Sequence, residues 1–129
     1  MPNFDRLSIY QPYAIAVLRI ITALLFIEHG TMKLFDFPAA AMPGPLPMLP
    51  LIAGLLEVFG GLLILVGFLT RPVAFILCGQ MAVAYFMAHA PKSFYPALNG
   101  GDGAVLFCFI FLALVFTGAG ALSVDNRKS

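Results

Sequence analysis

Four long apolar segments alternate with short stretches rich in proline, glycine and charged residues. Each segment approaches the roughly 20 residues that an α-helix needs to cross about 30 Å of hydrocarbon. The pattern therefore predicts an all-α fold: a polytopic membrane protein in which a bundle of four transmembrane helices makes up one domain, residues 1–129. The predicted spans are residues 13–35, 49–69, 72–90 and 101–117.

Local signals suggest where several spans begin and how they are joined. Pro12 suits the first turn of a helix, where its missing N–H breaks no hydrogen bond, and Thr70 is expected to cap the third helix. Residues 99–102 (Asn-Gly-Gly-Asp) form a capping arrangement before the fourth helix. The five prolines of residues 36–50 exclude a helix there and favour an extended loop, which is either a stiff outer lid or a plain connector.

The composition supports lipid as the solvent of this chain. Hydrophobic residues make up 61% of the sequence and charged residues 10%, against roughly 25% charged in an average soluble domain. A net charge of +1 with no basic cluster beyond Arg127 and Lys128 excludes nucleic acid as a partner. Cys78 and Cys108 occur singly in apolar surroundings, so we expect free thiols that serve in packing.

The positive charges predict an orientation in the membrane. Cytoplasmic segments carry more Lys and Arg than outer segments, which favours both termini in the cytoplasm. The first span lacks a cleavage pattern, so we expect it to remain in the mature protein. In this orientation the inner segments hold Arg6, Arg71, Arg127 and Lys128, and the outer segments hold Lys33 and Lys92.

Ionisable side chains in the spans are the strongest candidates for function, because a charge in lipid is costly. When the four helices cross the membrane in turn, six of these ionisable side chains lie on the same, outer side of the bundle. Glu57 is then roughly 12 Å below the start of its helix. They are Glu28, His29, Lys33, Glu57, His89 and Asp102.

The helical repeat sorts the first span into two faces. At about 100° per residue, one stripe collects most of its polar and small residues, and Glu28 points the opposite way. One of the two faces must meet another helix. Arg19 lies roughly 9 Å from the inner end and is expected to extend to the surface. The stripe contains Arg19, Thr22, Ala23, Phe26, His29, Gly30 and Lys33.

The second span predicts a buried acid. Gly54, Glu57 and Gly61 share one face, and small residues allow another helix to approach closely. Glu57 then either performs chemistry or locks the bundle by pairing with Arg19, Lys33 or a backbone donor. Gln80, in the middle of the third span, is expected to form a hydrogen bond between helices.

Proton transfer, quinone headgroup binding and metal binding are the chemistries open to these residues. Glu57, His29 and His89 are the candidate proton-exchanging groups. Because no HExxH-type spacing is present, no metal site is predicted. Capping explains Asp102 equally well, and Lys33 and His89 also suit interfacial anchoring. The candidates for binding a quinone headgroup are Lys33, Glu28, Tyr85 and Asp102.

Several motifs resemble the DoxX family. They are residues 26–35 (Phe-Ile-Glu-His-Gly-Thr-Met-Lys-Leu-Phe), 57–61 (Glu-Val-Phe-Gly-Gly), 67–71 (Gly-Phe-Leu-Thr-Arg) and 117–125 (Thr-Gly-Ala-Gly-Ala-Leu-Ser-Val-Asp). The resemblance implies a small four-helix protein of the bacterial inner membrane. By analogy with a membrane subunit of a thiosulfate:quinone oxidoreductase and with a redox-stress membrane complex, it also implies an oxidoreductase subunit.

Two other functions stay open. The chain is alternatively a non-catalytic scaffold or assembly subunit that binds a partner protein, or an oligomeric carrier of a small solute or proton. All three hypotheses require the lipid bilayer and a protein partner or further copies of the chain.

Overall fold

The computed structural model describes residues 3–127, and within that range it is entirely helical and loop, without strands. The predicted all-α fold is confirmed. The elements are a 3₁₀ helix at Asp5–Tyr10, α1 at Gln11–Phe35, α2 at Met48–Val66, α3 at Thr70–Ala84, a π turn at Tyr85–His89, a 3₁₀ turn at Ala90–Lys92, α4 at Pro96–Asn99 and α5 at Asp102–Thr117.

Three continuous helical stretches are long and apolar enough to cross a membrane. They cover Asp5–Phe35, Met48–Val66 and Thr70–Lys92, with 31, 19 and 23 residues. α5 is also apolar but has 16 residues, or roughly 24 Å at the rise of an α-helix. The fourth span therefore lies where it was predicted but is shorter than the hydrocarbon core.

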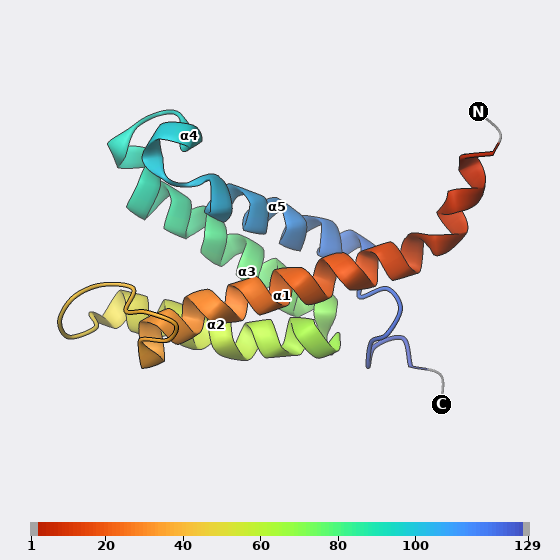
Figure 1. Cartoon of the computed structure of the whole chain (residues 1–129), viewed down its shortest axis with the longest axis horizontal. Coiled ribbons are helices and arrows are strands. Elements are labelled where there is room, and N and C mark those ends of the chain that lie inside the picture. The colour runs from red at the N-terminus through yellow and green to blue at the C-terminus, as the bar shows by residue number, and fades with distance from the viewer. Residues whose placement is uncertain (1–2, 128–129) are drawn as a thin grey trace.

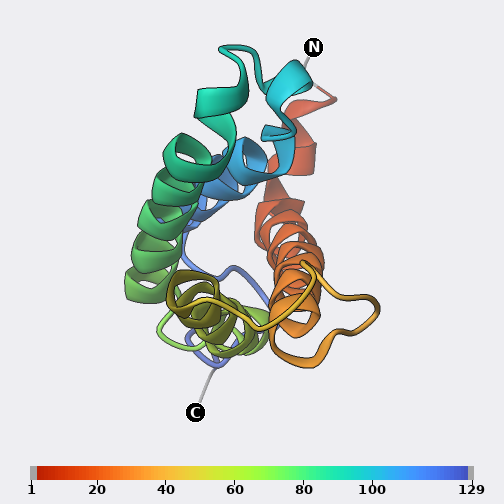
Figure 2. The same cartoon turned by 90° about the vertical axis from the view of Figure 1, so that its left-hand side faces the viewer.

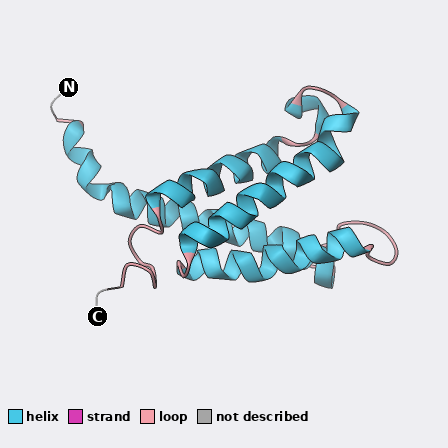
Figure 3. Ribbon diagram, turned by 180° about the vertical axis from the view of Figure 1, so that it is seen from behind, coloured by secondary structure: helices cyan, strands magenta, loops and turns pink. Residues whose placement is uncertain are grey.

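The helices form two antiparallel hairpins, α1 with α2 and α3 with α5, and contacts are far denser within each hairpin than between them. The hairpins meet near the turn from α2 to α3 and diverge toward the end that carries α4 and the α1–α2 loop (Figures 1 and 3). Figure 2, which views that diverging end, shows α1 at the right and α2 at the bottom, with α3 at the left and α4 and α5 above.

A small apolar core joins the hairpins. Phe26 of α1 meets Phe111 of α5 edge to face, with 4.9 Å between ring centroids. Many other large apolar side chains point outward: Phe59, Phe75 and Phe109 are 62%, 67% and 62% exposed. Such a surface would be costly in water, so it identifies lipid as the surrounding solvent.

Glycines bring α1 and α2 together, as their spacing predicts. Gly54, Glu57 and Gly61 are buried. A Cβ atom added to Gly61 would lie 2.5 Å from Ile27 Cγ1, and one added to Gly30 would lie 2.7 Å from Val58 Cγ2. The close approach of the two backbones therefore depends on the absence of side chains at these positions.

The start of α3 corrects one predicted cap. Thr70 is the first residue of the helix and not its N-cap. The carboxylate of Asp125 accepts hydrogen bonds from the backbone N–H groups of Leu69 and Thr70, both at 2.9 Å. A carboxylate from the far end of the sequence thus fulfils the capping role that local sequence assigned to a threonine.

The predicted extension of Arg19 to the surface is wrong. Its side chain is 0% exposed, because the segment after α5 folds back over it. The guanidinium donates to the carbonyl oxygens of Ala119 and Ala121 through Nη1, and to that of Leu122 at 2.8 Å through Nη2. This segment is in turn held by a hydrogen bond from Ala121 N to Pro12 O at 2.9 Å.

Candidate functional site

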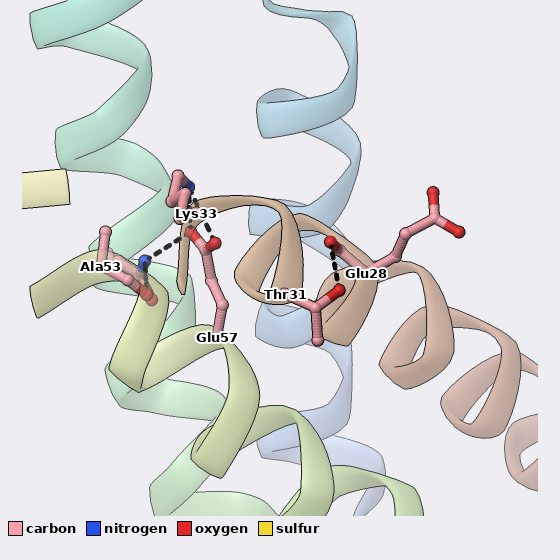
Figure 4. Close-up of polar contacts among 6 residues, drawn as sticks. Glu28, Thr31, Lys33, Ala53 and Glu57 are labelled. Atoms are coloured by element: carbon pink, nitrogen blue, oxygen red, sulfur yellow. Dashed lines mark hydrogen bonds and ion pairs between the residues drawn. The ribbon is translucent and has the colours of Figure 1, made fainter. Parts of the chain in front are cut away.

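Glu57 lies at the centre of a polar cluster that joins three helices. It is 2% exposed, and its carboxylate accepts hydrogen bonds from Lys33 Nζ at 2.8 and 2.7 Å. Gln80 Nε2 of α3 donates to the same carboxylate at 3.0 Å. Figure 4 shows Lys33 directed at Glu57 across the α1–α2 contact. The predicted burial is confirmed, and of the three partners considered for Glu57 the structure selects Lys33.

Small residues let Lys33 reach the carboxylate. A Cβ atom added to Gly54, one turn before Glu57, would lie 3.2 Å from Lys33 Cβ and 2.9 Å from Leu34 Cδ2. A Cβ atom on Gly30, one turn before Lys33, would lie 2.9 Å from Glu57 Cβ. The two glycines therefore set the helix separation that makes the ion pair possible.

Gln80 leaves one acceptor of the cluster free. Its Nε2 is directed at Glu57 and, more weakly, at Ala53 O at 3.4 Å. Both are acceptors, so the opposite amide orientation would set an oxygen against oxygens. Gln80 Oε1 is buried and has no hydrogen-bond partner among residues 3–127. Because a buried acceptor without a donor is costly, this oxygen is suited to a ligand O–H or a water molecule.

A cavity of about 270 Å³ adjoins Lys33 at the end of α1. Its walls come from α1, the proline-rich loop and the start of α2, and include Met42, Leu46 and Leu51. Protein ligand pockets usually measure roughly 300–1,000 Å³, so this cavity matches a small ligand or a headgroup. Lys33 belongs both to the cavity wall and to the ion pair, while the predicted loop forms part of the enclosure.

Glu28 and His29 lie on the same end of the bundle but outside this cluster. Both are exposed. Figure 4 shows the Glu28 side chain directed away from Glu57. The ring of His29 packs edge-on against Phe107 of α5, at 5.7 Å between centroids. The helical repeat correctly placed Glu28 opposite the buried stripe, but His29 is the exposed member of that stripe.

His89 belongs to a second cluster, on the α3–α5 hairpin. Its Nδ1 lies 3.1 Å from Asn99 O, which can only accept, so Nδ1 donates this hydrogen bond. Asn99 is 3% exposed and its amide donates to Tyr85 Oη at 3.1 Å and to Ser93 O at 2.9 Å. Its Oδ1 accepts from Gly101 N at 2.8 Å.

Asn99 is thus the central residue of this second cluster, a role that sequence reasoning missed. The only sequence signal was its place in the capping arrangement of residues 99–102. Asp102 is exposed and lies in the first turn of α5, where a carboxylate favours the helix dipole. Within residues 3–127 no hydrogen bond links Glu57 to either histidine or to Asp102.

The six predicted residues therefore share one end of the bundle, but they form separate groups. No set of three His, Cys, Asp or Glu side chains in the described chain comes together closely enough to hold a metal ion. The fold and the site define the class: a small polytopic helical membrane protein with an ion pair, Lys33–Glu57, at its diverging end.

Comparison with known proteins identifies the family. The DoxX family matches residues 14–90, and the chain belongs to that family. The resemblance carried by the motifs is thereby confirmed. No solved structure matches this chain.

Three relatives extend over nearly the whole chain. An uncharacterized protein of Haemophilus influenzae is 44% identical over 130 residues, which cover 95% of this chain and 96% of that protein. Inner membrane protein YqjF of Escherichia coli K12 is 36% identical, covering 92% and 96%. Inner membrane protein YphA of the same organism is 31% identical, covering 91% of each.

Proposed function

We propose that this DoxX-family protein is a quinone-linked subunit of a membrane oxidoreductase in the bacterial inner membrane. The headgroup would bind beside Lys33, Glu57 and Gln80. The observation that carries the proposal is the Lys33–Glu57 pair, whose buried Glu57 also bonds Gln80 with its unpartnered Oε1 and whose Lys33 lines the 270 Å³ cavity.

The available donors and acceptors fit both redox forms of a quinone. A quinone supplies two-electron, two-proton redox chemistry; its carbonyl oxygens accept hydrogen bonds, and the O–H groups of the hydroquinone donate them. Lys33 Nζ is a donor for the oxidised form, and Gln80 Oε1 is a free acceptor for the reduced form. Apolar side chains of the cavity wall, such as Met42 and Leu46, suit the ring.

Each residue of the cluster has a definite task in this proposal. Lys33 neutralises the Glu57 carboxylate in an apolar setting and favours negative charge on a bound oxygen. The Glu57 carboxylate would accept a proton from the O–H group of a bound hydroquinone. His29 and His89 stay candidates for exchanging protons at the rim of the bundle. Glu28 and Asp102, exposed and directed elsewhere, are given no role at the headgroup.

Ligand-dependent stability tests this proposal directly. Purified protein in micelles is unfolded thermally with and without decylubiquinone. At a ligand concentration about 100 times its Kd, binding stabilises a protein by roughly 2.7 kcal/mol. We expect a rise in Tm for the native chain that Lys33→Met and Gln80→Leu reduce. Glu28→Gln, which removes an acid from the same end, is the matched control and should keep the full rise. A native chain without any rise would falsify the proposal.

A scaffold function is the second candidate, because one surface observation favours it. A Cβ atom added to Gly79 of α3 or to Gly103 of α5 would have no neighbour within 4 Å, so both helices present a place where another helix can approach closely. In that case Gly79→Leu abolishes cellular function, while Glu57→Gln leaves it intact. The opposite outcome supports the quinone proposal.

We also propose that both termini face the cytoplasm. Arg71 and Arg127 lie at the end where α2 passes to α3, and Lys33 and Lys92 lie toward the other end, so positive charge favours the first end inside. Fusion of green fluorescent protein to the C-terminus should give fluorescent cells, and an alkaline phosphatase fusion at the same position should be inactive. The reverse pair of results contradicts the orientation.

A further inference from the structure

We propose that Cys78 and Cys108 are a redox-active dithiol, oxidised by a quinone to a disulfide between α3 and α5. The inference names the electron donor of the proposed function and rests on it for the class of oxidant. It does not depend on the residues of the Glu57 cluster.

Packing brings the two thiols together. Cys78 of α3 and Cys108 of α5 are 30 positions apart, yet their Sγ atoms lie 3.7 Å from each other. Both side chains are half-buried and lie against the apolar core. Since a disulfide has an S–S distance of about 2.04 Å, the sulfur atoms need to approach by roughly 1.7 Å. Rotation of short side chains on two helices already in contact can supply such a movement.

The depth of the thiols selects a lipid-soluble oxidant. Cys78 lies eight residues into α3, roughly 12 Å from its start, and Cys108 lies six residues into α5, roughly 9 Å from its start. Because the two helices are antiparallel, both thiols are in the apolar middle of the bundle. Glutathione and other charged oxidants do not enter hydrocarbon, whereas quinones partition into it.

The same helix connects the thiols with the polar cluster. Gln80 follows Cys78 by two residues, a rotation of about 200°, so the two side chains project from opposite faces of α3. Gln80 meets Glu57 of α2, and Cys78 meets Cys108 of α5. A disulfide would fix α3 against α5 on one face and so hold Gln80 in place on the other.

The reaction balances with a quinone alone. Two S–H bonds break and one S–S bond forms, so the dithiol loses two electrons and two protons. The quinone takes up both electrons and both protons and becomes the hydroquinone. One disulfide therefore appears for each quinone reduced, and no metal or further reactant is required.

Intact mass and thiol alkylation measure this step. Reduced full-length protein in liposomes is incubated with decylubiquinone, denatured and alkylated with N-ethylmaleimide. We expect monomeric protein that is lighter by two hydrogen atoms and carries no maleimide, with one hydroquinone formed per chain. Oxidised glutathione should leave both thiols reactive. Cys78→Ser and Cys108→Ser are the matched controls, each keeping one reactive thiol and forming no hydroquinone.

Three results overturn the inference. The first is a native chain that stays fully alkylated after decylubiquinone while its helical circular dichroism is intact. The second is a disulfide between two chains instead of within one. The third is oxidation by cumene hydroperoxide but not by decylubiquinone, which removes quinone as the oxidant.

The dithiol and the headgroup site can fail independently. If native protein forms the disulfide but Lys33→Met shows an unchanged Tm rise with decylubiquinone, the dithiol stands and the headgroup site fails. If native protein shows a Tm rise that Lys33→Met removes but never forms the disulfide, the headgroup site stands and the dithiol inference is rejected.

Discussion

The two ends of the bundle use charged side chains in different ways. At the end that carries the α2–α3 turn, Arg19 donates to backbone carbonyls of the C-terminal segment. Arg71 donates to Val115 O and Phe116 O at the end of α5 at 2.8 and 2.7 Å, and Asp125 accepts from the start of α3. At the diverging end, Lys33 and Glu57 bind each other instead.

Charged side chains that bond backbone groups serve the structure, whereas charged side chains that bond each other are available for chemistry. Backbone groups at helix ends must be satisfied, so Arg19, Arg71 and Asp125 complete the fold. A buried ion pair, in contrast, gains little stability over apolar residues of similar volume. The Lys33–Glu57 pair also has an unpartnered acceptor, Gln80 Oε1, and a cavity beside it. The following substitutions test this contrast in the use of charge.

Replacing Arg19 by Met should have the largest effect on folding. Several buried carbonyl oxygens would lose their donors, at about 1–3 kcal/mol for each unsatisfied group. We expect a loss of more than about 3 kcal/mol in the free energy of unfolding, measured by titration with sodium dodecyl sulfate in mixed micelles. Arg6→Met, at an exposed arginine, is the control and should change little. Equal stability of the two variants contradicts a structural role for Arg19.

A double-mutant cycle at Lys33 and Glu57 should show that protein stability and ligand binding respond differently to loss of the pair. Glu57→Gln leaves a cation without its partner. Because Lys33 is 24% exposed and can turn toward water, we expect about 1–3 kcal/mol of destabilisation rather than the 3–5 of a fully buried pair. Adding Lys33→Met should restore part of that stability without restoring the rise in Tm with decylubiquinone. If the double variant recovered both the stability and the rise in Tm with decylubiquinone, the pair would serve only to stabilise the fold.

Gly30→Ala should disturb the Lys33–Glu57 site through packing. The new Cβ atom would lie 2.7 Å from Val58 Cγ2 and 2.9 Å from Glu57 Cβ, and overpacking of this kind costs typically 1–3 kcal/mol. We expect lower stability and a weaker ligand response, measured as Tm with and without decylubiquinone. Gly79→Ala is the matched control: a Cβ there meets nothing within 4 Å, so higher helix propensity should leave the protein as stable or up to about 1 kcal/mol more stable.

Asp125→Asn should have the smallest effect, together with a defined pH dependence. Partial burial alone would raise the pKa of Asp125, but hydrogen bonds from Thr70 and Leu69 and the charge of Arg19 lower it below the ordinary 3.8. A lowered folded-state pKa stabilises the fold above the unfolded value, and this contribution disappears as the pH falls through the folded value.

We expect Asp125→Asn to lose about 1 kcal/mol at pH 7, as for a helix cap. The difference between native and variant chains should narrow below pH 4, as followed by thermal unfolding across pH. A difference that is constant down to acidic pH would show that the carboxylate charge is not what stabilises α3.

Periodicity and small-residue spacing predicted the Glu57 site well but not completely. The buried face of α2 and the position of Glu28 opposite Arg19 follow from the helical repeat, because a helix fixes the angle of each side chain. Only the packing of α1 against α2 decided that the Glu28 face is the exposed one. Gln80 was expected to bridge helices, yet nothing local shows that its partner is Glu57. The two histidines share an end with Glu57 but not a cluster, since the divergence of the hairpins is invisible in a linear pattern.

The sequence by itself determined four apolar helices, their order, the buried face of α2 and the resemblance to the DoxX family, because these depend on composition and on short-range repeats. Tertiary structure alone decided what lies across from each face. It placed the C-terminal segment over Arg19, the carboxylate of Asp125 at the start of α3, and Cys78 beside Cys108. Each of these contacts joins residues 30 or more positions apart, and such pairings depend on how the hairpins pack rather than on the pattern within any one helix.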